Sequence, residues 1–239
     1  MKGIILAGGT GSRLYPLTKV TNKHLLPIGD QPMIIHNVKK LVEASVTDIM
    51  IITGTEHMGD MISLLGSGSE YNCNFTFRVQ DKPDGIGGAL SLCKNFVGSD
   101  TCIVILGDNI FEDCLTDHIS DFIQDGRACQ LLLKKVPDPE RYGVAIFDGD
   151  RVSQIEEKPD LPKSDYAITG IYMYDNKVFD IISTLVPSAR GEYEITDINN
   201  AYIENNQMFY KIMDGWWTDA GTLKSYYKAN RLITSGILE

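Results

Sequence analysis

Apolar residues in the first half of the chain alternate between short continuous runs and segments with helical spacing. We expect strands at the four runs, residues 2–6, 48–53, 75–79 and 102–106, with helices between them at 31–44, 58–65 and 84–89. A run that is apolar on both faces, such as 48–53, is typical of a parallel strand covered by helices on both sides. The order predicts an α/β fold with a doubly wound, mostly parallel, Rossmann-like sheet, whose ligands bind outside the carboxyl ends of the strands.

The pattern changes after about residue 127. Shorter, β-rich pieces follow at 130–136, 144–147, 152–156 and 168–174, with helices at 177–185 and 195–205 and a last strand and a helix at 224–234. No Ser/Gly linker, low-complexity segment or internal repeat separates the parts. We therefore expect one domain over 1–239, made of two halves at about 1–127 and 128–239.

Composition excludes several classes of protein. The 239 residues include 43% hydrophobic residues, enough for a sizeable core, and 22 Lys and Arg against 32 Asp and Glu give a net charge of −10. This balance argues against nucleic acid as a partner, and no apolar run approaches the roughly 18 residues of a membrane span. The five cysteines are widely spaced and the start of the chain has no secretory pattern, so we expect a cytoplasmic protein with reduced thiols.

A glycine-rich turn follows the first predicted strand, with the sequence Gly8-Gly9-Thr10-Gly11-Ser12-Arg13-Leu14. Its backbone N–H groups and hydroxyls suit a phosphate chain, although a tight strand-to-helix turn would have the same pattern. Leu14 stands where the dinucleotide fingerprint needs a third glycine, which excludes a dinucleotide oxidoreductase, and the chain has no P-loop Gly-Lys-Ser/Thr. Arg13 and Lys23 favour the phosphate interpretation, because they place cations beside the turn of an acidic protein.

Several segments together identify a family. The glycine turn with Pro16-Leu17-Thr18, Lys23 and Leu25-Leu26-Pro27 resembles the signature of sugar-1-phosphate nucleotidylyltransferases. The resemblance extends through Leu106–Phe111, Arg141–Val144, Glu156–Pro159, Ala189–Glu192, Ile195–Asn199 and Trp217–Thr222. It covers nearly the whole chain in the family's order, and it implies the nucleotidyltransferase fold, with nucleotide in the first half and sugar phosphate in the second.

Within the family, these segments are most similar to members that use dTTP and glucose 1-phosphate. The resemblance implies an enzyme that transfers a thymidylyl group to glucose 1-phosphate, giving dTDP-glucose and pyrophosphate by Mg²⁺-dependent in-line displacement. This is the first step of dTDP-sugar, and in particular dTDP-rhamnose, biosynthesis. It also implies a homodimer or homotetramer. Longer members continue with a helical segment that contributes to an allosteric nucleotide site, so feedback by the end product is doubtful here, although a site between subunits stays open.

The resemblance assigns roles to individual residues. Catalysis would depend on Arg13, Lys23, Asp108, Lys158 and Asp219, and Asp108 and Asp219 would hold Mg²⁺. The nucleotide would contact Leu6, Gly8, Gly9, Thr10, Gly11, Ser12, Arg13, Gln80, Gly85 and Asp108. The sugar phosphate would contact Tyr142, Gly143, Glu157, Lys158, Thr169, Gly170, Arg190 and Glu192. Carboxylates and backbone groups suit the sugar because each hydroxyl both donates and accepts, and oxygen ligands suit a hard cation on a triphosphate.

Structural interpretations of the same residues stay open. Asp108 could belong to an Asp-Asn turn, Asp219 could lie at a helix start, and Lys158 and Arg190 could be solvated cations. We expect no site at the scattered histidines and core positions for the paired tryptophans; these residues are His24, His36, His57, His118, Trp216 and Trp217.

The sequence also departs from the family at one segment. Gly85-Ile86-Gly87-Gly88-Ala89 has glycines where a Leu-Ala-Gln-Ala type is expected, which leaves a uridylyltransferase acting on a related hexose 1-phosphate as an alternative. A non-catalytic domain that senses nucleotide or sugar nucleotide is the alternative from another class.

Overall fold

The chain forms two compact units, each assembled from segments that are separated in the sequence. The computed structural model describes residues 1–235. The glycine-loop unit contains Lys2–Pro83, Ile105–Leu115 and the segment from Gly215 onward, and the β-rich unit contains Asp84–Val104 and Thr116–Asp214, together with Met1. Each unit has its own secondary structure and its own set of predicted site residues.

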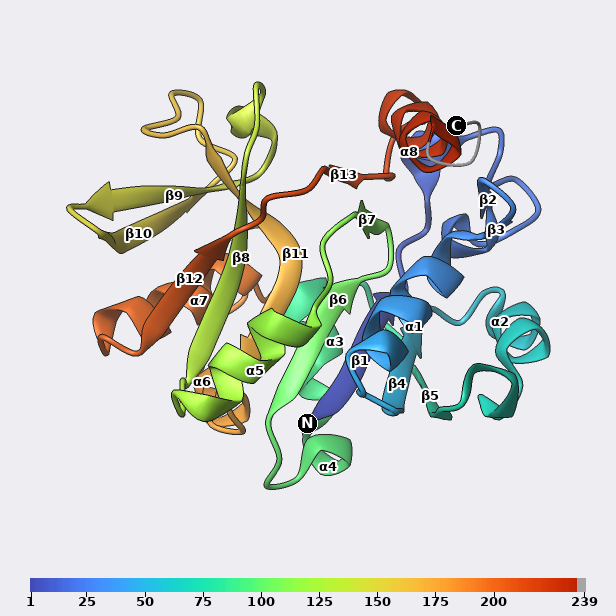
Figure 1. Ribbon diagram of the computed structural model, residues 1–239, viewed down its shortest axis with the longest axis horizontal. Coiled ribbons are helices and arrows are strands. Elements are labelled where there is room, and N and C mark those ends of the chain that lie inside the picture. The colour runs from blue at the N-terminus through green and yellow to red at the C-terminus, as the bar shows by residue number, and fades with distance from the viewer. Residues whose placement is uncertain (236–239) are drawn as a thin grey trace. The chain divides into compact units, whose positions relative to one another are not determined.

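Three parallel strands form the sheet of the glycine-loop unit (Figure 1). They are β1 (Lys2–Ala7), β4 (Asp48–Thr53) and β5 (Asn74–Val79), in the order β1-β4-β5 with Ile5 opposite Ile51 and Ile51 opposite Phe77. The helices α1 (Met33–Glu43) and α2 (Met58–Leu65) connect them, with the 3-10 turn η3 (Ser69–Tyr71). This is the predicted alternation of strand and helix.

Helix α1 shows how the sequence sets an element and its ends. Met33, Val38 and Leu41 are fully buried on one face. The helix ends where Ser45 adopts φ +61° and its N–H donates to Val42 O at 2.9 Å, a left-handed C-terminal cap. Its start is later than predicted because Gln31–Pro32 form β3, which pairs with β2 (Pro27–Ile28).

The same unit is completed by segments from the middle and end of the chain. Strand β6 (Cys102–Leu106) contributes its last two residues, and β7 (Asn109–Phe111) pairs antiparallel with β13 (Trp217–Asp219). Helix α8 (Leu223–Ser235) follows. An apolar cluster joins α8 to the region after β1, with Leu14, Leu26, Ile28, Met33, Ile110, Ala220, Tyr226 and Ala229 buried in it. Trp217 is buried, as expected of a core residue, whereas Trp216 is half-buried and packs against this cluster.

Five strands of the β-rich unit follow the order β10-β9-β11-β8-β12, and the first three residues of β6 also belong to this unit. They are β8 (Cys129–Lys135), β9 (Gly143–Asp148), β10 (Arg151–Glu157), β11 (Tyr166–Tyr174) and β12 (Met208–Ile212), all antiparallel except β12 with β8. Its helices are α3 (Gly85–Ser91), α4 (Lys94–Val97), α5 (Thr116–Gln124), α6 (Val178–Thr184) and α7 (Ile195–Glu204), with the 3-10 turn η4 (Pro139–Arg141).

The α/β class, with a parallel part followed by a β-rich part, is confirmed. The division into halves at residue 127 stays a prediction, because it was defined by ligands rather than by compactness. Over residues 1–235, the structure contains no helix that combines the length and the apolar character needed to span a bilayer.

Candidate functional site

The glycine turn is fixed by hydrogen bonds at its carboxyl-terminal end, and residues before and after Gly11 are exposed. Gly11 has φ +67°, which favours glycine, and its carbonyl accepts from the Leu14 N–H and the Thr18 hydroxyl, both at 2.8 Å. Leu14 is buried at the end of the 3-10 turn η1 (Ser12–Leu14). Gly9, Thr10 and Ser12 are exposed, so the loop is accessible to solvent above a fixed base.

Lys23 lies against this loop. It begins the 3-10 turn η2 (Lys23–Leu25), where Asn22 is the N-cap: its Oδ1 accepts the His24 N–H at 2.8 Å and its Nδ2 donates to Ala7 O at 3.2 Å. A Cβ added at Gly9 would lie 3.3 Å from Lys23 Nζ. Asn22 therefore connects the end of β1 to the turn that places the ammonium group beside the glycine loop.

Asp108 joins the same site from the end of β6. The Gly107 N–H donates to Leu6 O at 2.9 Å, which puts the carboxyl ends of β1 and β6 side by side. Lys23 Nζ donates to Asp108 Oδ2 at 2.5 Å. Burial, the largest single influence, would raise the pKa of this carboxyl, but the positive charge of Lys23 and the hydrogen bonds from Lys23 and Asn109 together lower the pKa to about 2. Asp108 is therefore ionised at neutral pH.

Three predicted residues converge on one point near Gly221. A Cβ added at Gly221 would lie 3.1 Å from Asp108 Oδ2, 3.4 Å from an Arg13 guanidinium nitrogen and 3.6 Å from Asp219 Oδ2. The Ala220 N–H donates to Asp108 O at 2.7 Å, which fixes the segment after β13 against Asp108. The absence of a side chain at Gly221 keeps two carboxylates and a guanidinium around one small space.

The side chains around this space supply part of the coordination shell that a hard divalent cation requires. Asp108 and Asp219 offer carboxylate oxygens, which Mg²⁺ prefers, and Mg²⁺ is commonly held by one or two carboxylates with water and substrate phosphates completing its shell. Within residues 1–235, no group of three or more His, Cys, Asp and Glu side chains could hold a metal alone. A cation here would therefore need ligands from a bound phosphate or water, and it would compete with Lys23 for Asp108.

Gln80 borders the glycine turn from the end of β5. A Cβ added at Gly8 would lie 3.2 Å from Gln80 Oε1, and the Gln80 N–H donates to Thr53 O at 2.8 Å. The glycine-loop unit thus gathers Leu6, the turn, Lys23, Gln80, Asp108 and Asp219. Gly85, the remaining residue predicted to contact nucleotide, belongs to the β-rich unit at the start of α3.

The β-rich unit brings together a second set at the paired ends of β9 and β10. Gly143 lies opposite Glu157, and the Lys158 N–H donates to Tyr142 O at 2.9 Å. Lys158 adopts φ +45°, an uncommon backbone for a residue with a side chain, and its Nζ lies 3.1 Å from Glu157 Oε1. These contacts fix the point from which the Lys158 ammonium group projects.

Arg190 and Glu192 lie in a loop held by its own hydrogen bonds. Arg190 Nη2 donates to both carboxylate oxygens of Glu194 at 3.0 Å, and it lies 3.4 Å from Glu192 Oε2. The bond to Glu194 raises the pKa of the guanidinium above its usual value. Glu157, Lys158 and Arg190 border an open groove of about 690 Å³, which is also lined by Ser188, Glu194, Thr196 and their neighbours. The groove combines cations for a phosphate with carboxylates for hydroxyl groups.

Thr169 and Gly170 are placed differently from the other predicted sugar contacts. Both are buried in β11, and the Thr169 hydroxyl donates to Leu132 O at 2.7 Å. The Thr169 hydroxyl is therefore engaged within the sheet, and a contact of these residues with sugar stays a prediction.

Three residues that support the site were not singled out from the sequence. Glu194 holds Arg190, Thr196 donates to Glu157 Oε2 at 2.9 Å, and Asn22 holds the turn at Lys23. An asparagine directly before a polar turn is an N-cap signal that could have found Asn22. Glu194 and Thr196 act through tertiary contacts, which no local pattern indicates.

His24 lies behind the site as a buried, neutral group. Its Nδ1 is 2.6 Å from Asn22 Oδ1, its ring packs against Gly107, and burial lowers its pKa from 6.5 to about 3. Between pH 6.5 and 3 the unfolded chain binds a proton that the folded chain excludes, so acid should destabilise the protein. We expect the unfolding free energy of His24→Gln to decrease less steeply than that of wild type as the pH falls through this range. One proton contributes at most about 1.4 kcal/mol per pH unit to this slope.

Urea unfolding at pH 7, 6, 5 and 4 measures this effect of His24. The matched control is His57→Gln, because His57 is more exposed, with its Nδ1 3.1 Å from Asp60 Oδ2. The control should keep the wild-type slope, and a wild-type slope in His24→Gln would contradict the prediction.

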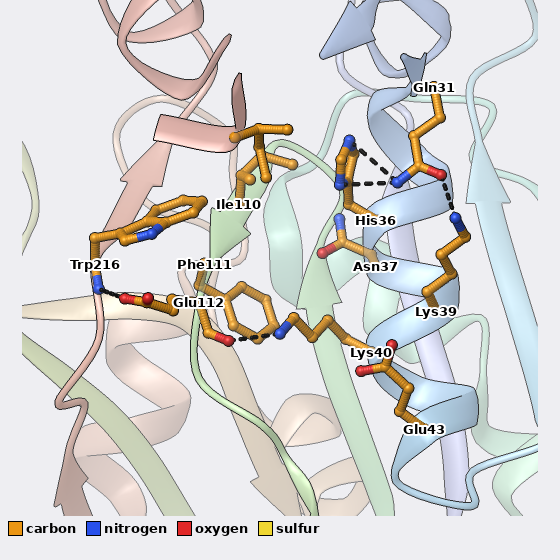
Figure 2. Close-up of a pocket in the computed structure, with 11 residues that line it drawn as sticks. Gln31, His36, Asn37, Lys39, Lys40, Glu43, Ile110, Phe111, Glu112 and Trp216 are labelled. Carbon is orange, nitrogen blue, oxygen red and sulfur yellow. Dashed lines mark hydrogen bonds between the residues drawn. The ribbon is translucent and has the colours of Figure 1, made fainter. Parts of the chain in front are cut away.

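A second hollow of the glycine-loop unit contains none of the predicted residues. It lies beside α1 (Figure 2), and its volume is about 250 Å³. Lys40 Nζ donates to Glu112 O at 2.6 Å and the Trp216 N–H donates to Glu112 Oε2 at 3.0 Å. Asn37 Nδ2 donates to Gly107 O at 3.1 Å, whereas its buried Oδ1 has no partner among the described residues. This hollow is separate from the phosphate site, although Asn37 supports the turn before Asp108.

Comparison with known proteins shows the family of this chain. A family model described as nucleotidyl transferase matches residues 2–236, so the chain belongs to the nucleotidyl transferase family. The predicted family is therefore confirmed.

Two relatives with assigned activities are similar to this chain over most of its length. The chain is 41% identical over 233 residues to a glucose-1-phosphate thymidylyltransferase of Neisseria meningitidis, covering 96% of this chain and 81% of the relative. It is 42% identical over 236 residues to one of Xanthomonas campestris pv. campestris, covering 97% of this chain and 80% of the relative.

Solved structures agree in fold. A Bacillus anthracis structure with a sucrose bound, provisionally described as a glucose-1-phosphate thymidylyltransferase, has a TM-score of 0.94 and 60% identity, covering 97% of this chain and 94% of that one. A UDP-glucose pyrophosphorylase complexed with UDP-glucose has a TM-score of 0.86 and 23% identity, covering 98% of both chains, and shows the fold alone.

Proposed function

We propose that this protein transfers the thymidylyl group of dTTP to glucose 1-phosphate, producing dTDP-glucose and pyrophosphate, the first step of dTDP-sugar synthesis. The observation that carries the proposal is the convergence of Arg13, Asp108 and Asp219 on one point beside the glycine loop. Such a site suits a triphosphate. Loop N–H groups and cationic side chains bind the phosphate oxygens, and the carboxylates hold a metal cation. The named relatives support thymidylyl and glucose as the groups involved.

The reaction is a direct displacement. A phosphate oxygen of glucose 1-phosphate attacks the α-phosphorus of dTTP in line, the bond to the β-phosphate oxygen breaks, and pyrophosphate leaves with the electron pair. The obstacle is the approach of two anions, since two unit charges about 4 Å apart repel by roughly 4 kcal/mol at an effective dielectric of 20. The phosphate monoester is already largely ionised near neutral pH, so we assign no general base.

The residues of this chain act by binding and charge stabilisation. Lys158 and Arg190 hold the sugar phosphate and reduce its charge, while Glu157 and Glu192 accept from sugar hydroxyls. In the glycine-loop unit, Arg13 and the loop N–H groups bind the leaving pyrophosphate, and Lys23 lies on the side of the α-phosphate. Gln80 and Gly85 would read the pyrimidine edge, the amide by paired donor and acceptor groups.

Asp108 and Asp219 would hold Mg²⁺ on the nucleotide. When bound, the ion supplies positive charge to phosphate oxygens. We expect chelation with EDTA to lower pyrophosphate release by more than about 100-fold and added Mg²⁺ to restore it. Turnover that persists after chelation and dialysis would exclude a metal requirement.

A substrate matrix tests the proposed function. The protein is incubated with Mg²⁺, each of dTTP, UTP, ATP and GTP, and each of glucose, galactose and mannose 1-phosphate, and pyrophosphate is assayed. We expect the highest kcat/KM with dTTP and glucose 1-phosphate. UTP should be a weaker substrate, because it lacks the methyl group of thymine, which in a pocket discriminates by about 1 to 3 kcal/mol, and carries a 2′-hydroxyl that dTTP lacks. A higher kcat/KM with another pair would assign a different specificity.

The same assay distinguishes an enzyme from a non-catalytic sensing domain, because a sensing domain would bind nucleotide without releasing pyrophosphate. The presence of Arg13, Lys23, Asp108, Lys158 and Asp219 favours catalysis. A cytoplasmic location and assembly as a homodimer or homotetramer belong to this proposal and rest on the family resemblance. Light scattering would measure the oligomeric state.

A further inference from the structure

Lys23 donates to the Asp108 oxygen that lies nearest Gly221. Lys23 Nζ is 2.5 Å from Asp108 Oδ2, whereas the other oxygen, Oδ1, accepts from Asn109 Nδ2 at 3.2 Å. A Cβ added at Gly221 would lie 3.1 Å from Asp108 Oδ2 and 3.6 Å from Asp219 Oδ2, so these two oxygens border the same small space. The ammonium group therefore occupies the oxygen that a cation held by both carboxylates would use.

Removing Lys23 from Asp108 is unfavourable unless the ammonium group gains another partner. The two side chains are 12% and 14% exposed, so both charges are largely removed from water. Breaking such a pair leaves a buried charge uncompensated, and keeping it while a cation enters places two positive charges beside one oxygen. A divalent cation that arrives without nucleotide meets one of these two penalties.

The stem of Lys23 lies along the glycine loop. A Cβ added at Gly11 would lie 3.0 Å from Lys23 Cβ, and one added at Gly9 would lie 3.2 Å from Lys23 Cε and 3.3 Å from its Nζ. The ammonium group is thus next to the backbone to which we assign the triphosphate. Rotation about the last bonds of the side chain can change its partner while the stem stays in place, and its three N–H donors suit phosphate oxygens as well as a carboxylate.

We propose that Lys23 makes the binding of a divalent cation depend on nucleotide. In the free protein, the ammonium group pairs with Asp108 Oδ2 and competes with the cation for it. A triphosphate on the loop supplies new acceptors for the ammonium group, which leaves Asp108 Oδ2 to the cation. Asp108 is then paired with positive charge in both states. This inference rests on the proposed function, which assigns the triphosphate to the loop.

Binding of Mn²⁺ to the free protein tests the proposal without turnover, because the EPR signal of the aqueous ion measures the unbound fraction. We expect Lys23→Met to lower the Kd for Mn²⁺ about tenfold, or about 1.4 kcal/mol, since the variant keeps a stem of similar length and removes the competing charge. The matched control is Lys19→Met, the same change at an exposed position of the same segment. It should change the Kd less than about twofold, because exposed charges are screened. Equal Kd values in wild type and Lys23→Met, or equal tightening in both variants, would overturn the proposal.

A second measurement uses the wild-type protein and so does not depend on the folding of a variant. Mn²⁺ is titrated into an equimolar complex of protein and dTTP without sugar phosphate, and it should bind at least about tenfold more tightly than to the free protein. Equal affinities would overturn the proposal, as would a difference in folded Lys23→Met as large as in wild type. A wild-type protein that released no pyrophosphate from any substrate pair would instead contradict the proposed function, so the two failures are distinguishable.

Discussion

Replacing Asp108 with asparagine is expected to lower kcat by more than about 100-fold, or about 3 kcal/mol of transition-state stabilisation, while the chain stays folded. The variant keeps the size of the side chain and its position after β6 but loses the charge that pairs with Lys23 at 2.5 Å and that would hold a cation. Single-turnover pyrophosphate release measures the effect on chemistry, and circular dichroism with thermal unfolding reports the fold.

The matched control for Asp108→Asn is Asp100→Asn, which makes the same chemical change at an exposed position in the turn after α4. This variant should keep wild-type kcat. Near-wild-type turnover in Asp108→Asn would remove Asp108 from the catalytic assignment, and an unfolded Asp108→Asn protein would assign it a structural role instead.

Replacing Lys158 with alanine is expected to lower kcat/KM for glucose 1-phosphate by more than about 100-fold, near 3 kcal/mol, with a much smaller effect on dTTP binding. The ammonium group projects from a backbone at φ +45° that the bond to Tyr142 O holds. It would carry a charge-assisted bond to the sugar phosphate. Kinetics at varied sugar phosphate and saturating dTTP measure the loss.

Two further variants separate the charge of Lys158 from its strained backbone. Lys158→Gly relieves the left-handed conformation but also removes the ammonium group, so it should be as impaired as the alanine variant. Lys163→Ala removes a nearby lysine that pairs with Glu156 at 2.7 Å, and it should retain wild-type activity. Recovery in the glycine variant would mean that backbone geometry, rather than charge, explains the loss.

Much of the fold could be predicted from local pattern. The bounds of β4, α2 and β6 were predicted to the residue, because each is a short apolar run or an amphipathic segment between clear breaks. A last strand was expected between the helices at 195–205 and 224–234, without bounds, and β12 lies there. Its bounds could not be predicted because its side chains are mostly half-buried and it pairs with the distant β8. Helix α5 was missed because only Ile119 and Phe122 are buried in it.

The sequence predicted residues of the candidate site, but it did not predict the contacts between them. Chemistry and family resemblance indicated Asp108, Asp219 and Arg190. The sequence could not show that Gly221 leaves the space where Asp108 and Asp219 meet, or that Glu194 holds Arg190, because these contacts depend on how segments far apart in the chain pack together.

Because each unit is assembled from segments far apart in the chain, the order of synthesis also constrains when the protein can fold. Leu14 and Leu26, which support the phosphate loop near the amino terminus, pack in one cluster with Tyr226 and Ala229 of α8. A nascent chain emerging from the ribosome therefore cannot complete the base of its phosphate loop until α8 has also been synthesised. The glycine turn gains its rigid support only after that helix has packed against Leu14 and Leu26.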